Sequence, residues 1–386
     1  MLVYGTRPEA IKMAPVVRAL EQSPRLEPLV VLTGQHRSML EQVNLDFEIA
    51  ADHNLDIMQA GQSLHDITAR SLGGVSRLIA AERPDMVLVQ GDTSSALAAA
   101  LAAFYAQVPV AHLEAGLRTE DRYSPYPEEM NRRLTSQLAS LHLVPTPASR
   151  DNLLRENVNR NSIITTGNTV IDALLWTVQR DRPFSDPQLQ SIERSERPIL
   201  LVTAHRRESW GEPMRRVAHA LVEISWRLPE VQIVLPAHRN PVVRETLLPI
   251  LEGGRNILVL EPLPYPDFTR LLSISSVVVT DSGGVQEEAP SLGKPVLVMR
   301  DSTERPEGVE AGTARLVGTS PTAIVDAVHS LVRDKSAYRA MARAINPYGD
   351  GRAAERTVDA LNFYFKLGLA PQPFDPRSGM PSRGAA

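Results

Sequence analysis

The chain has 386 residues, 43% of them hydrophobic, and this length predicts two globular domains because one core rarely serves more than about 250 residues. A formal charge of −4 at pH 7 excludes a basic surface for non-specific nucleic-acid binding. The lack of cysteine excludes disulfides and thiolate zinc sites. No apolar run is long enough for a membrane span or a signal peptide, so we expect a cytoplasmic protein that does not bind membranes.

Short apolar runs rich in β-branched residues alternate with helical patterns along the chain. Such continuous runs are typical of parallel strands buried on both faces. They predict an α/β fold with two Rossmann-like, doubly wound parallel-sheet domains. The predicted strands are 2–4, 29–33, 86–90, 108–112 and 141–145 in the first half, and 199–203, 232–236, 257–260, 277–280, 295–299 and 314–318 in the second.

The loops between these patterns indicate the domain limits. The polar stretch 181–187 is typical of a linker, with an alternative boundary up to one helix earlier, near Thr169. The C-terminal tail is rich in proline, glycine and serine, which is typical of disorder. The expected limits are 1–170 for an N-terminal domain, 171–352 for a second domain, 353–366 for a helix that packs back on the N-terminal domain, and 367–386 for a disordered tail.

Ligands of open α/β sheets bind beyond the carboxyl ends of the strands, so the residues after each predicted strand are candidates for a site. The first strand is followed by G-T-R-P-E-A-I-K, which places Arg7 and Lys12 on the opening turns of a helix. Backbone N–H groups and the helix dipole favour an anion there. The alternative is that both residues are surface charges. Pro15, farther along the same pattern, predicts a kink or a restart of the helix.

The stretch V-V-V-T-D-S-G-G-V-Q-E-E-A predicts a strand, a tight turn and a helix. Ser282, Gly283 and Gly284 can offer hydroxyl and N–H donors to a diphosphate, because glycine lets the backbone approach closely. The motifs of an NTP-hydrolysing P-loop and of a nicotinamide site do not occur. Glu288 is a candidate for holding ribose hydroxyls; alternatively, it and Glu287 only complement the helix N-terminus.

Two further strand ends carry histidine next to arginine. V-T-A-H-R-R-E-S places His205, Arg206 and Arg207 directly after a buried strand, which favours contact with a ligand over a surface turn. V-L-P-A-H-R-N-P repeats the pattern with His238 and Arg239, where both interpretations stay open.

Carboxylates follow the strands of the first half. Asp92 in Q-G-D-T and Glu114 in H-L-E-A-G-L-R-T each follow an apolar strand, and Glu128 and Glu129 stand in Y-P-E-E-M-N-R. Several carboxylates opposite an anion-binding second domain favour general acid–base chemistry on a sugar-like substrate. The alternative for Asp92 and Glu129 is helix capping. No H-E-x-x-H or Asp-x-Asp cluster occurs, so we expect no metal site.

In these motifs, and in T-G-N-T-V-I-D-A-L, T-E-R-P-E-G and N-P-Y-G-D-G, the chain resembles the bacterial non-hydrolysing UDP-N-acetylglucosamine 2-epimerases. The resemblance covers residues 1–365 and implies the GT-B architecture, in which two Rossmann-like domains face a cleft. It also implies a homodimer and a place in cell-surface polysaccharide biosynthesis. The chain departs from the family pattern at Gln90, where members often have histidine.

Carried over by motif, the resemblance implies a role for each candidate. The UDP diphosphate is bound by Arg7, His205 and the Ser282 turn, the ribose by Glu288, and Phe268 lies near the uracil. The implied residues are Asp92, Glu114, Glu128 and His205 for catalysis; Arg7, Lys12, Phe268, Ser282, Gly283, Gly284, Glu288 and Arg305 for substrate binding; and Gln35, His36, Arg206 and His238 for binding a second UDP-N-acetylglucosamine as an activator.

The resemblance implies reversible epimerisation at C2 of UDP-N-acetylglucosamine to UDP-N-acetylmannosamine, by anti elimination of UDP to 2-acetamidoglucal and syn re-addition. The chemistry agrees with this route, because the C2 hydrogen is not next to a carbonyl and becomes acidic only when loss of UDP builds positive charge at C1. We expect no cofactor, neither metal nor NAD. The alternatives are a hydrolysing 2-epimerase that releases N-acetylmannosamine and UDP, a GT-B glycosyltransferase, and an inactive sugar-nucleotide sensor.

Overall fold

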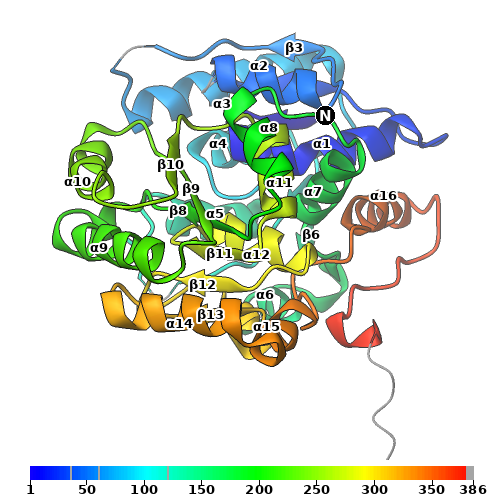
Figure 1. Cartoon of the computed structure of the whole chain (residues 1–386). Helices are drawn as coiled ribbons and strands as arrows, with labels where there is room; N and C mark the ends of the chain where they lie inside the picture. Colours follow the sequence, from blue (N-terminus) through cyan, green and yellow to red (C-terminus); the bar gives the residue numbers. More distant parts are fainter. Residues whose placement is uncertain (35–36, 60, 120, 380–386) are drawn as a thin grey trace, which may run out of the picture. The chain divides into compact units, whose positions relative to one another are not determined.

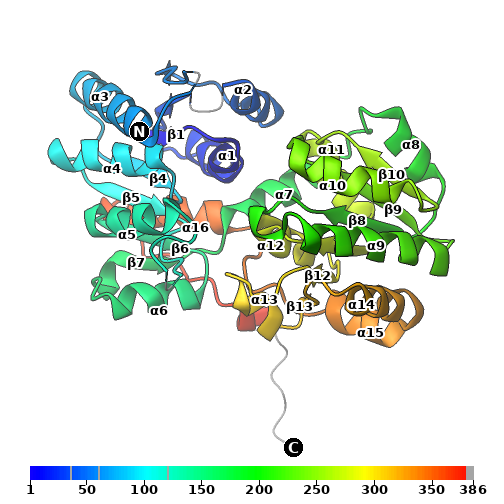
Figure 2. The same ribbon diagram turned by 90° about the vertical axis from the view of Figure 1, so that its left-hand side faces the viewer.

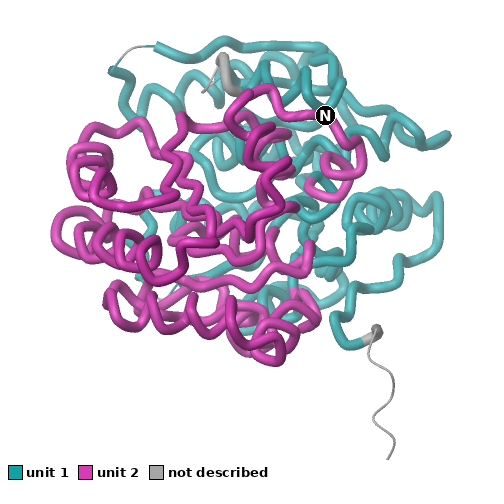
Figure 3. Tube along the Cα trace, viewed as in Figure 1, with its two compact units in different colours: residues 1–173, 348–386 teal, residues 174–347 magenta. Residues whose placement is uncertain are grey.

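The computed structural model describes residues 1–34, 37–59, 61–119 and 121–379. The chain divides into two compact units (Figure 3). Unit 1 consists of Met1–Ala173 and Tyr348–Ala386, and unit 2 of Leu174–Pro347. Helix α7 (Thr169–Gln179) carries the chain from unit 1 into unit 2.

The described residues of unit 1 form a seven-stranded sheet in which all neighbouring strands run parallel. Strands β3 and β6 of this sheet are labelled in Figure 1. The strand order is β3-β2-β1-β4-β5-β6-β7, so the direction of winding reverses between β1 and β4. Sites of doubly wound sheets lie at this point, beyond the carboxyl ends of the strands. The strands are β1 (Leu2–Tyr4), β2 (Val30–Leu32), β3 (His53–Asn54), β4 (Val87–Gln90), β5 (Val110–Leu113), β6 (Leu141–Val144) and β7 (Ile163–Thr165).

Helices cover both faces of this sheet (Figure 2). On one face α4 lies between α3 and α5, and on the other α1 lies between α2 and α16. Strand residues such as Val3, Val87 and Val89 pack against Ala99 and Ala103 of α4. The helices are α1 (Arg7–Glu21), α2 (Arg37–Asp46), α3 (Leu64–Glu82), α4 (Ser94–Tyr105), α5 (Glu128–Leu138), α6 (Pro147–Arg155), η1 (Arg160–Ser162), α16 (Ala353–Tyr364) and η3 (Pro376–Gly379).

The restart of the helix that was expected as one outcome at Pro15 does not occur, because α1 runs without interruption from Arg7 to Glu21. A proline inside a helix removes one backbone hydrogen bond. Ala14, Val16 and Val17 are fully buried on either side of Pro15, so packing keeps the helix together at this point.

Unit 2 contains a six-stranded parallel sheet in the order β10-β9-β8-β11-β12-β13. Its strands supply two separate cores because successive side chains point to opposite faces. Leu200 and Val202 of β8 belong to one core, and Ile199 and Leu201 to the other. The strands are β8 (Ile199–Thr203), β9 (Gln232–Pro236), β10 (Ile257–Leu260), β11 (Val277–Thr280), β12 (Val296–Val298) and β13 (Ala314–Leu316).

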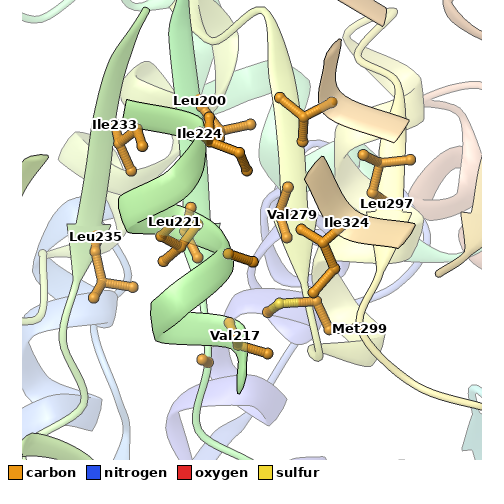
Figure 4. Packing of buried hydrophobic residues seen from close by; sticks show 14 of the residues in the cluster. Leu200, Val217, Leu221, Ile224, Ile233, Leu235, Val279, Leu297, Met299 and Ile324 are labelled. Carbon is orange, nitrogen blue, oxygen red and sulfur yellow. The ribbon is translucent and has the colours of Figure 1, made fainter. Parts of the chain in front are cut away.

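One of these cores lies beneath α9 and α14. Figure 4 shows Leu221 and Ile224 of α9 and Ile324 of α14 packed against residues of the strands such as Ile233 and Leu297. The helices of unit 2 are α8 (Pro187–Arg194), η2 (Arg207–Ser209), α9 (Glu212–Arg227), α10 (Pro241–Leu251), α11 (Tyr265–Ile274), α12 (Gly283–Ser291), α13 (Pro306–Glu310), α14 (Pro321–Arg333) and α15 (Lys335–Ala342).

The predicted fold class is confirmed, since both units are doubly wound parallel α/β structures, and each predicted strand is present. The sequence did not reveal β3 or β7, which contain only two and three residues. No helix of the described residues is long and apolar enough to cross a membrane.

The stretch 181–187 is part of unit 2 and does not link the units. Phe184 is 2% exposed in a core of unit 2, and the Ser185 N–H donates to Asp267 Oδ1 (3.2 Å). The chain passes between the units after Ala173 and again before Tyr348, whereas the expected limits were 170 and 352.

The expectation for the tail also differs from the structure as far as residue 379. Phe374 is 5% exposed, and its backbone N–H donates to Thr165 O (2.7 Å). Burial of the Phe374 ring, together with this hydrogen bond, thus holds in place a segment whose composition favours disorder. Residues 380–386 lie outside the described residues.

Candidate functional site

Glu114 directly follows β5, and side chains from other segments of unit 1 contact its carboxylate. Its backbone is left-handed, with φ of 61°, and its side chain is 7% exposed. Lys12 Nζ lies 2.5 Å from Oε1, and Asn168 Nδ2 donates to the same oxygen (3.0 Å). Gln90 Nε2 donates to Oε2. A cation on α1, an amide at the end of β4 and an amide after β7 therefore hold the direction of this carboxylate.

Asp92 follows the adjacent strand β4 and pairs with Arg132 of α5. Its Oδ2 accepts from Arg132 Nη2 (2.5 Å) and Nε (3.1 Å), and its backbone carbonyl accepts from Asn131 Nδ2 (2.9 Å). The Asp92 side chain remains 26% exposed. This two-point contact fixes the carboxylate and leaves part of it accessible to a substrate.

The two glutamates that begin α5 differ in their surroundings. Glu129 is fully buried, accepts from Arg133 Nε (2.7 Å) and the Thr119 N–H (3.0 Å), and joins α5 to the loop after Glu114. Glu128 is partly exposed, and its Oε2 is buried without a hydrogen-bond partner among the described residues. Glu128 is therefore the one of the pair whose carboxylate is not committed to a structural ion pair in the described part of the chain.

The cationic residues predicted on α1 lie at the same edge of the sheet. Arg7 is the first residue of α1 and is partly exposed, and Lys12 is the residue paired with Glu114. Lys12 thus contacts a predicted catalytic carboxylate in addition to its predicted place in the ligand site.

In unit 2, His205 follows β8 and lies against Asp281, which follows β11. Asp281 Oδ2 accepts from the backbone N–H groups of His205 (2.8 Å) and Arg206 (2.9 Å). Asp281 Oδ1 lies 3.1 Å from His205 Nδ1 and makes an electrostatic contact with it. Burial raises the pKa of Asp281, but His205 and these N–H groups outweigh it and hold the pKa below its usual range.

Asp281 is 1% exposed, whereas the His205 side chain is 41% exposed. The buried carboxylate therefore orients an accessible imidazole, which is the arrangement that a catalytic histidine needs.

The N-terminus of α12 is surrounded by cations. A Cβ atom on Gly283 would lie 3.4 Å from Arg305 Cζ and 3.6 Å from Arg206 Nη2. Ser282 is the N-cap residue and its side chain makes no capping hydrogen bond, while Gly284 is exposed. Helix N–H groups beside two guanidinium groups form a place where a phosphate can bind.

Both arginines are also held by carboxylates. Arg305 Nε lies 2.7 Å from Glu287 Oε1, and Arg206 Nη1 lies 2.8 Å from Glu304 Oε1. Burial raises the pKa of Glu304, but hydrogen bonds from Arg300 and the charge of Arg206 outweigh burial and lower it to about 2. These ion pairs orient the guanidinium groups before any ligand binds.

Glu288 and Phe268 lie farther along the predicted nucleotide site. Tyr265 OH donates to Glu288 Oε1 (2.9 Å), and Glu288 is 6% exposed. Phe268 of α11 packs against the core that contains Leu271 and is partly exposed.

Of the residues predicted to bind an activator, two can be located. The rings of His205 and His238 stack with centroids 6.0 Å apart, and burial together with the charge of His205 lowers the pKa of His238. Arg206 is the neighbour of His205 and faces Glu304. Gln35 and His36 lie outside the described residues.

Sequence reasoning assigned no role to four residues of these networks. Arg132 and Asn168 contact the predicted catalytic carboxylates, and Asp281 and Tyr265 contact His205 and Glu288. The signal available for Asp281 was its position directly after a buried strand. Within the described ranges, no group of three or more His, Asp or Glu side chains is arranged to hold a metal ion.

Comparison with known proteins identifies the family. The model of the UDP-N-acetylglucosamine 2-epimerase family matches residues 18–362. The UDP-N-acetylglucosamine 2-epimerases of Escherichia coli K12 and Yersinia pestis are each 53% identical to this chain over 368 residues, which is 94% of this chain and 97% of each relative.

A solved structure agrees. The crystal structure of UDP-GlcNAc 2-epimerase from Neisseria meningitidis bound to UDP-GlcNAc has a TM-score of 0.86 and 45% identity, with 93% of this chain and 98% of that chain covered. This likeness confirms the predicted fold class of two Rossmann-like units of the GT-B type. The match to the family model, the identity with these relatives and the shared fold show that the chain belongs to the UDP-N-acetylglucosamine 2-epimerase family.

Proposed function

We propose that this chain catalyses the reversible conversion of UDP-N-acetylglucosamine to UDP-N-acetylmannosamine without net hydrolysis. The observation that carries the proposal is the set of carboxylates at the carboxyl edge of the unit 1 sheet, above all Glu114 held by Lys12, Gln90 and Asn168. Inversion at C2 needs a base that removes a proton and an acid that returns one to the other face. Asp92, Glu114 and Glu128 are our candidates for these two tasks.

Unit 2 supplies the second requirement of the proposal, a site for the leaving group. When the C1–O bond breaks, the electron pair leaves with the diphosphate, and nearby cations and N–H groups stabilise this charge. Arg305, Arg206 and the N-terminus of α12 support such a site, with His205 as the group that assists the departing oxygen. Arg7, Ser282 and Gly284 complete the proposed phosphate contacts.

The proposed reaction has two balanced steps. In the first, a carboxylate takes the C2 proton, the C1–C2 double bond of 2-acetamidoglucal forms, and UDP leaves in an anti elimination. In the second, UDP adds back to C1 while a carboxylic acid protonates C2 on the opposite face, in a syn addition. Glu288, oriented by Tyr265, is proposed to hold the ribose, and Phe268 to lie near the uracil.

We further propose that the active form is a homodimer in the cytoplasm. A second UDP-N-acetylglucosamine is proposed to activate the enzyme through Gln35, His36, Arg206 and His238. A sigmoidal dependence of rate on substrate that becomes hyperbolic in His238→Ala would support the activator site, and hyperbolic wild-type kinetics would argue against it.

The proposed chemistry requires neither metal nor NAD, since the proton and the leaving group are handled by side chains. Dialysis against a chelator is expected to leave turnover unchanged. Loss of turnover that a divalent ion restores would refute this part of the proposal.

The deciding experiment is proton NMR of the purified protein with UDP-N-acetylglucosamine in D2O, repeated with Glu114→Gln. We expect UDP-N-acetylmannosamine to appear with deuterium at C2, because the removed proton exchanges with solvent before another is returned. The Glu114→Gln variant should lose roughly 100-fold or more in kcat, the usual size of a general acid–base contribution.

Other products would identify the alternatives. Accumulation of free N-acetylmannosamine and UDP as the end products would mean the hydrolysing reaction. Turnover only with an added sugar acceptor would mean a glycosyltransferase, and ligand binding without turnover would mean a sensor.

A further inference from the structure

Asn168 of unit 1 uses its side chain to bind Glu114 and its backbone to bind the segment that begins at Tyr348. It lies between β7 and α7 and is 3% exposed. Its Nδ2 donates to Glu114 Oε1 (3.0 Å), and its Oδ1 accepts from the Val170 N–H (3.1 Å). The second bond fixes which end of the amide faces Glu114, because an N–H can only be met by the carbonyl oxygen.

The backbone of Asn168 is fastened to the segment on which the chain returns from unit 2. Its N–H donates to the carbonyl of Tyr348 (2.7 Å), the first residue of that segment. A Cβ atom on Gly349 would lie only 3.1 Å from Ile171 Cγ1 and 3.4 Å from Asn168 O. The outgoing and the returning segments are therefore in close contact at this point. Asn168 therefore sits where the outgoing and returning segments are joined.

A second fastening lies one helical turn farther on. Asp172 accepts from the backbone N–H groups of Ala354 (2.8 Å) and Ala353 (3.2 Å) at the start of α16. Within the described part of the chain Asp172 makes no hydrogen bond to Glu114, so it strengthens the same junction without touching the carboxylate. Substitution of Asp172 therefore weakens the junction alone, whereas substitution of Asn168 also removes a hydrogen bond to Glu114.

We infer that Asn168 is a positioning residue for Glu114: its amide, itself held by the bonds to Val170 and Tyr348, fixes the direction of the carboxylate. The inference rests on the proposed function for the step that Glu114 performs. A glutamate side chain has three rotatable bonds, and a displacement of about 1 Å of a reacting group can lower a rate by roughly 100-fold. Asn168 touches Glu114 and not the reacting atoms, so its effect passes through that carboxylate.

The first test compares Asn168→Ala with Asp172→Asn. We expect Asn168→Ala to lower kcat roughly 10- to 100-fold, with KM changed less than about 3-fold, because binding groups remain while the carboxylate loses its orientation. Asp172→Asn should lower the melting temperature and leave kcat within about 2-fold. Equal losses of kcat in both variants, or a kcat of Asn168→Ala within about 3-fold of wild type, would overturn the inference.

The second test uses the isosteric variant Asn168→Asp. Two carboxylates then share one site, so one of them must hold a proton for the pair to persist. The activity of Asn168→Asp should rise as the pH is lowered from about 8 to 6, where the new carboxylic acid can donate a hydrogen bond as the amide does. Wild-type activity should not show this rise, and parallel pH–rate profiles would contradict the inference.

The third measurement does not depend on turnover. Crystal structures of wild type and Asn168→Ala should differ in the Glu114 side chain, which is expected in another rotamer or in several. If wild type fails to convert UDP-N-acetylglucosamine, the proposed function fails, and these structures still decide whether Asn168 positions Glu114. An unchanged Glu114 side chain would overturn the inference even if the enzyme is active.

Discussion

His112 is a fully buried histidine of β5, two residues before Glu114. Its Nε2 lies 2.7 Å from Gly91 O, and its Nδ1 is buried without a partner in the described part of the chain. Burial lowers the pKa of His112 to about 3, so the ring is neutral at pH 7 and Nε2 donates to the Gly91 carbonyl. This bond fixes the residue that precedes Asp92.

The lowered pKa of His112 predicts a loss of stability in acid. Between about pH 3 and 6.5 the unfolded chain binds a proton at His112 that the folded chain does not, so stability falls as the pH drops through this window. The slope reaches about 1.4 kcal/mol per pH unit for one group. Urea midpoints between pH 7 and 5 should therefore fall more steeply for wild type than for His112→Gln; parallel curves would show that His112 is not the group responsible.

Gly116 permits a close approach between the loop after β5 and α6. Its φ is +86°, and a Cβ atom would lie 2.3 Å from Ser149 O. Gly61 has a similar φ of +72° with nothing within 4 Å of the corresponding position, so Gly61→Ala measures the backbone strain alone. We expect Gly116→Ala to lower the free energy of unfolding by at least about 2 kcal/mol more than Gly61→Ala does.

Urea unfolding followed by circular dichroism measures this difference. If the free energy of unfolding falls equally in the two variants, α6 can shift without loss of stability and the close approach is not needed.

The sequence predicted the carboxylates but not the groups that hold them. Asp92 and Glu114 could be found because the carboxyl ends of parallel strands meet at one edge of the sheet. Arg132 could not, since it stands in a run of polar helix residues and its partner Asp92 is 40 positions away. Asn168 was hidden for the same reason, as only the folded chain brings it 3.0 Å from Glu114.

At the scale of elements, Glu9 joins the start of α1 to the start of α4. It is 1% exposed, its Oε2 accepts from the N–H groups of Gly5 (2.9 Å) and Thr6 (2.7 Å), and its Oε1 accepts from Thr93 Oγ1 (2.6 Å). Burial raises the pKa of Glu9, and these hydrogen bonds oppose the rise. One side chain thus connects the two turns that carry Arg7 and Asp92.

The loss in free energy of unfolding caused by a substitution at Glu9 should depend on whether the new side chain can still accept hydrogen bonds. Glu9→Gln keeps a carbonyl oxygen for the two N–H groups, and the Thr93 hydroxyl can turn to accept from the new amide, so the loss should stay near 1 kcal/mol. Glu9→Ala leaves buried donors without partners and should cost about 3 kcal/mol or more. Chemical denaturation of both variants at pH 7.5 tests this order, and equal losses would contradict it.

The elements also mark the limit of prediction from sequence. Strands such as β8 and β11 were predictable because their apolar runs serve cores on both faces. Strand β3 consists of His53 and Asn54 at the edge of the sheet, and β7 of Ile163–Thr165 at the other edge. Edge strands this short carry no pattern that distinguishes them from loops.

For the whole molecule, the two units have separate cores and can be observed separately. The tryptophans of the chain are Trp176, Trp210 and Trp226, and all lie in unit 2. Fluorescence therefore reports the unfolding of unit 2. A ligand that binds only the folded form stabilises it by about 2.7 kcal/mol when present at 100 times its dissociation constant.

The proposed diphosphate site predicts that UDP raises the fluorescence-detected melting temperature. In Gly283→Ala a methyl group would stand between the backbone and Arg305, so the phosphate could not approach the start of α12 and the UDP effect should disappear. Gly253→Ala, in the same unit and away from α12, should retain it. A full UDP effect in Gly283→Ala would place the diphosphate elsewhere.

Unit 1 is built from the two ends of the chain, with all of unit 2 between them. A ribosome therefore releases α1 long before α16, the helix that packs against it. Unit 2 is one continuous stretch and can fold as soon as it emerges, whereas the α16 side of α1 in unit 1 stays uncovered until α16 is made. Residues 1–173 are thus made before unit 2, yet the unit to which they belong is completed after it.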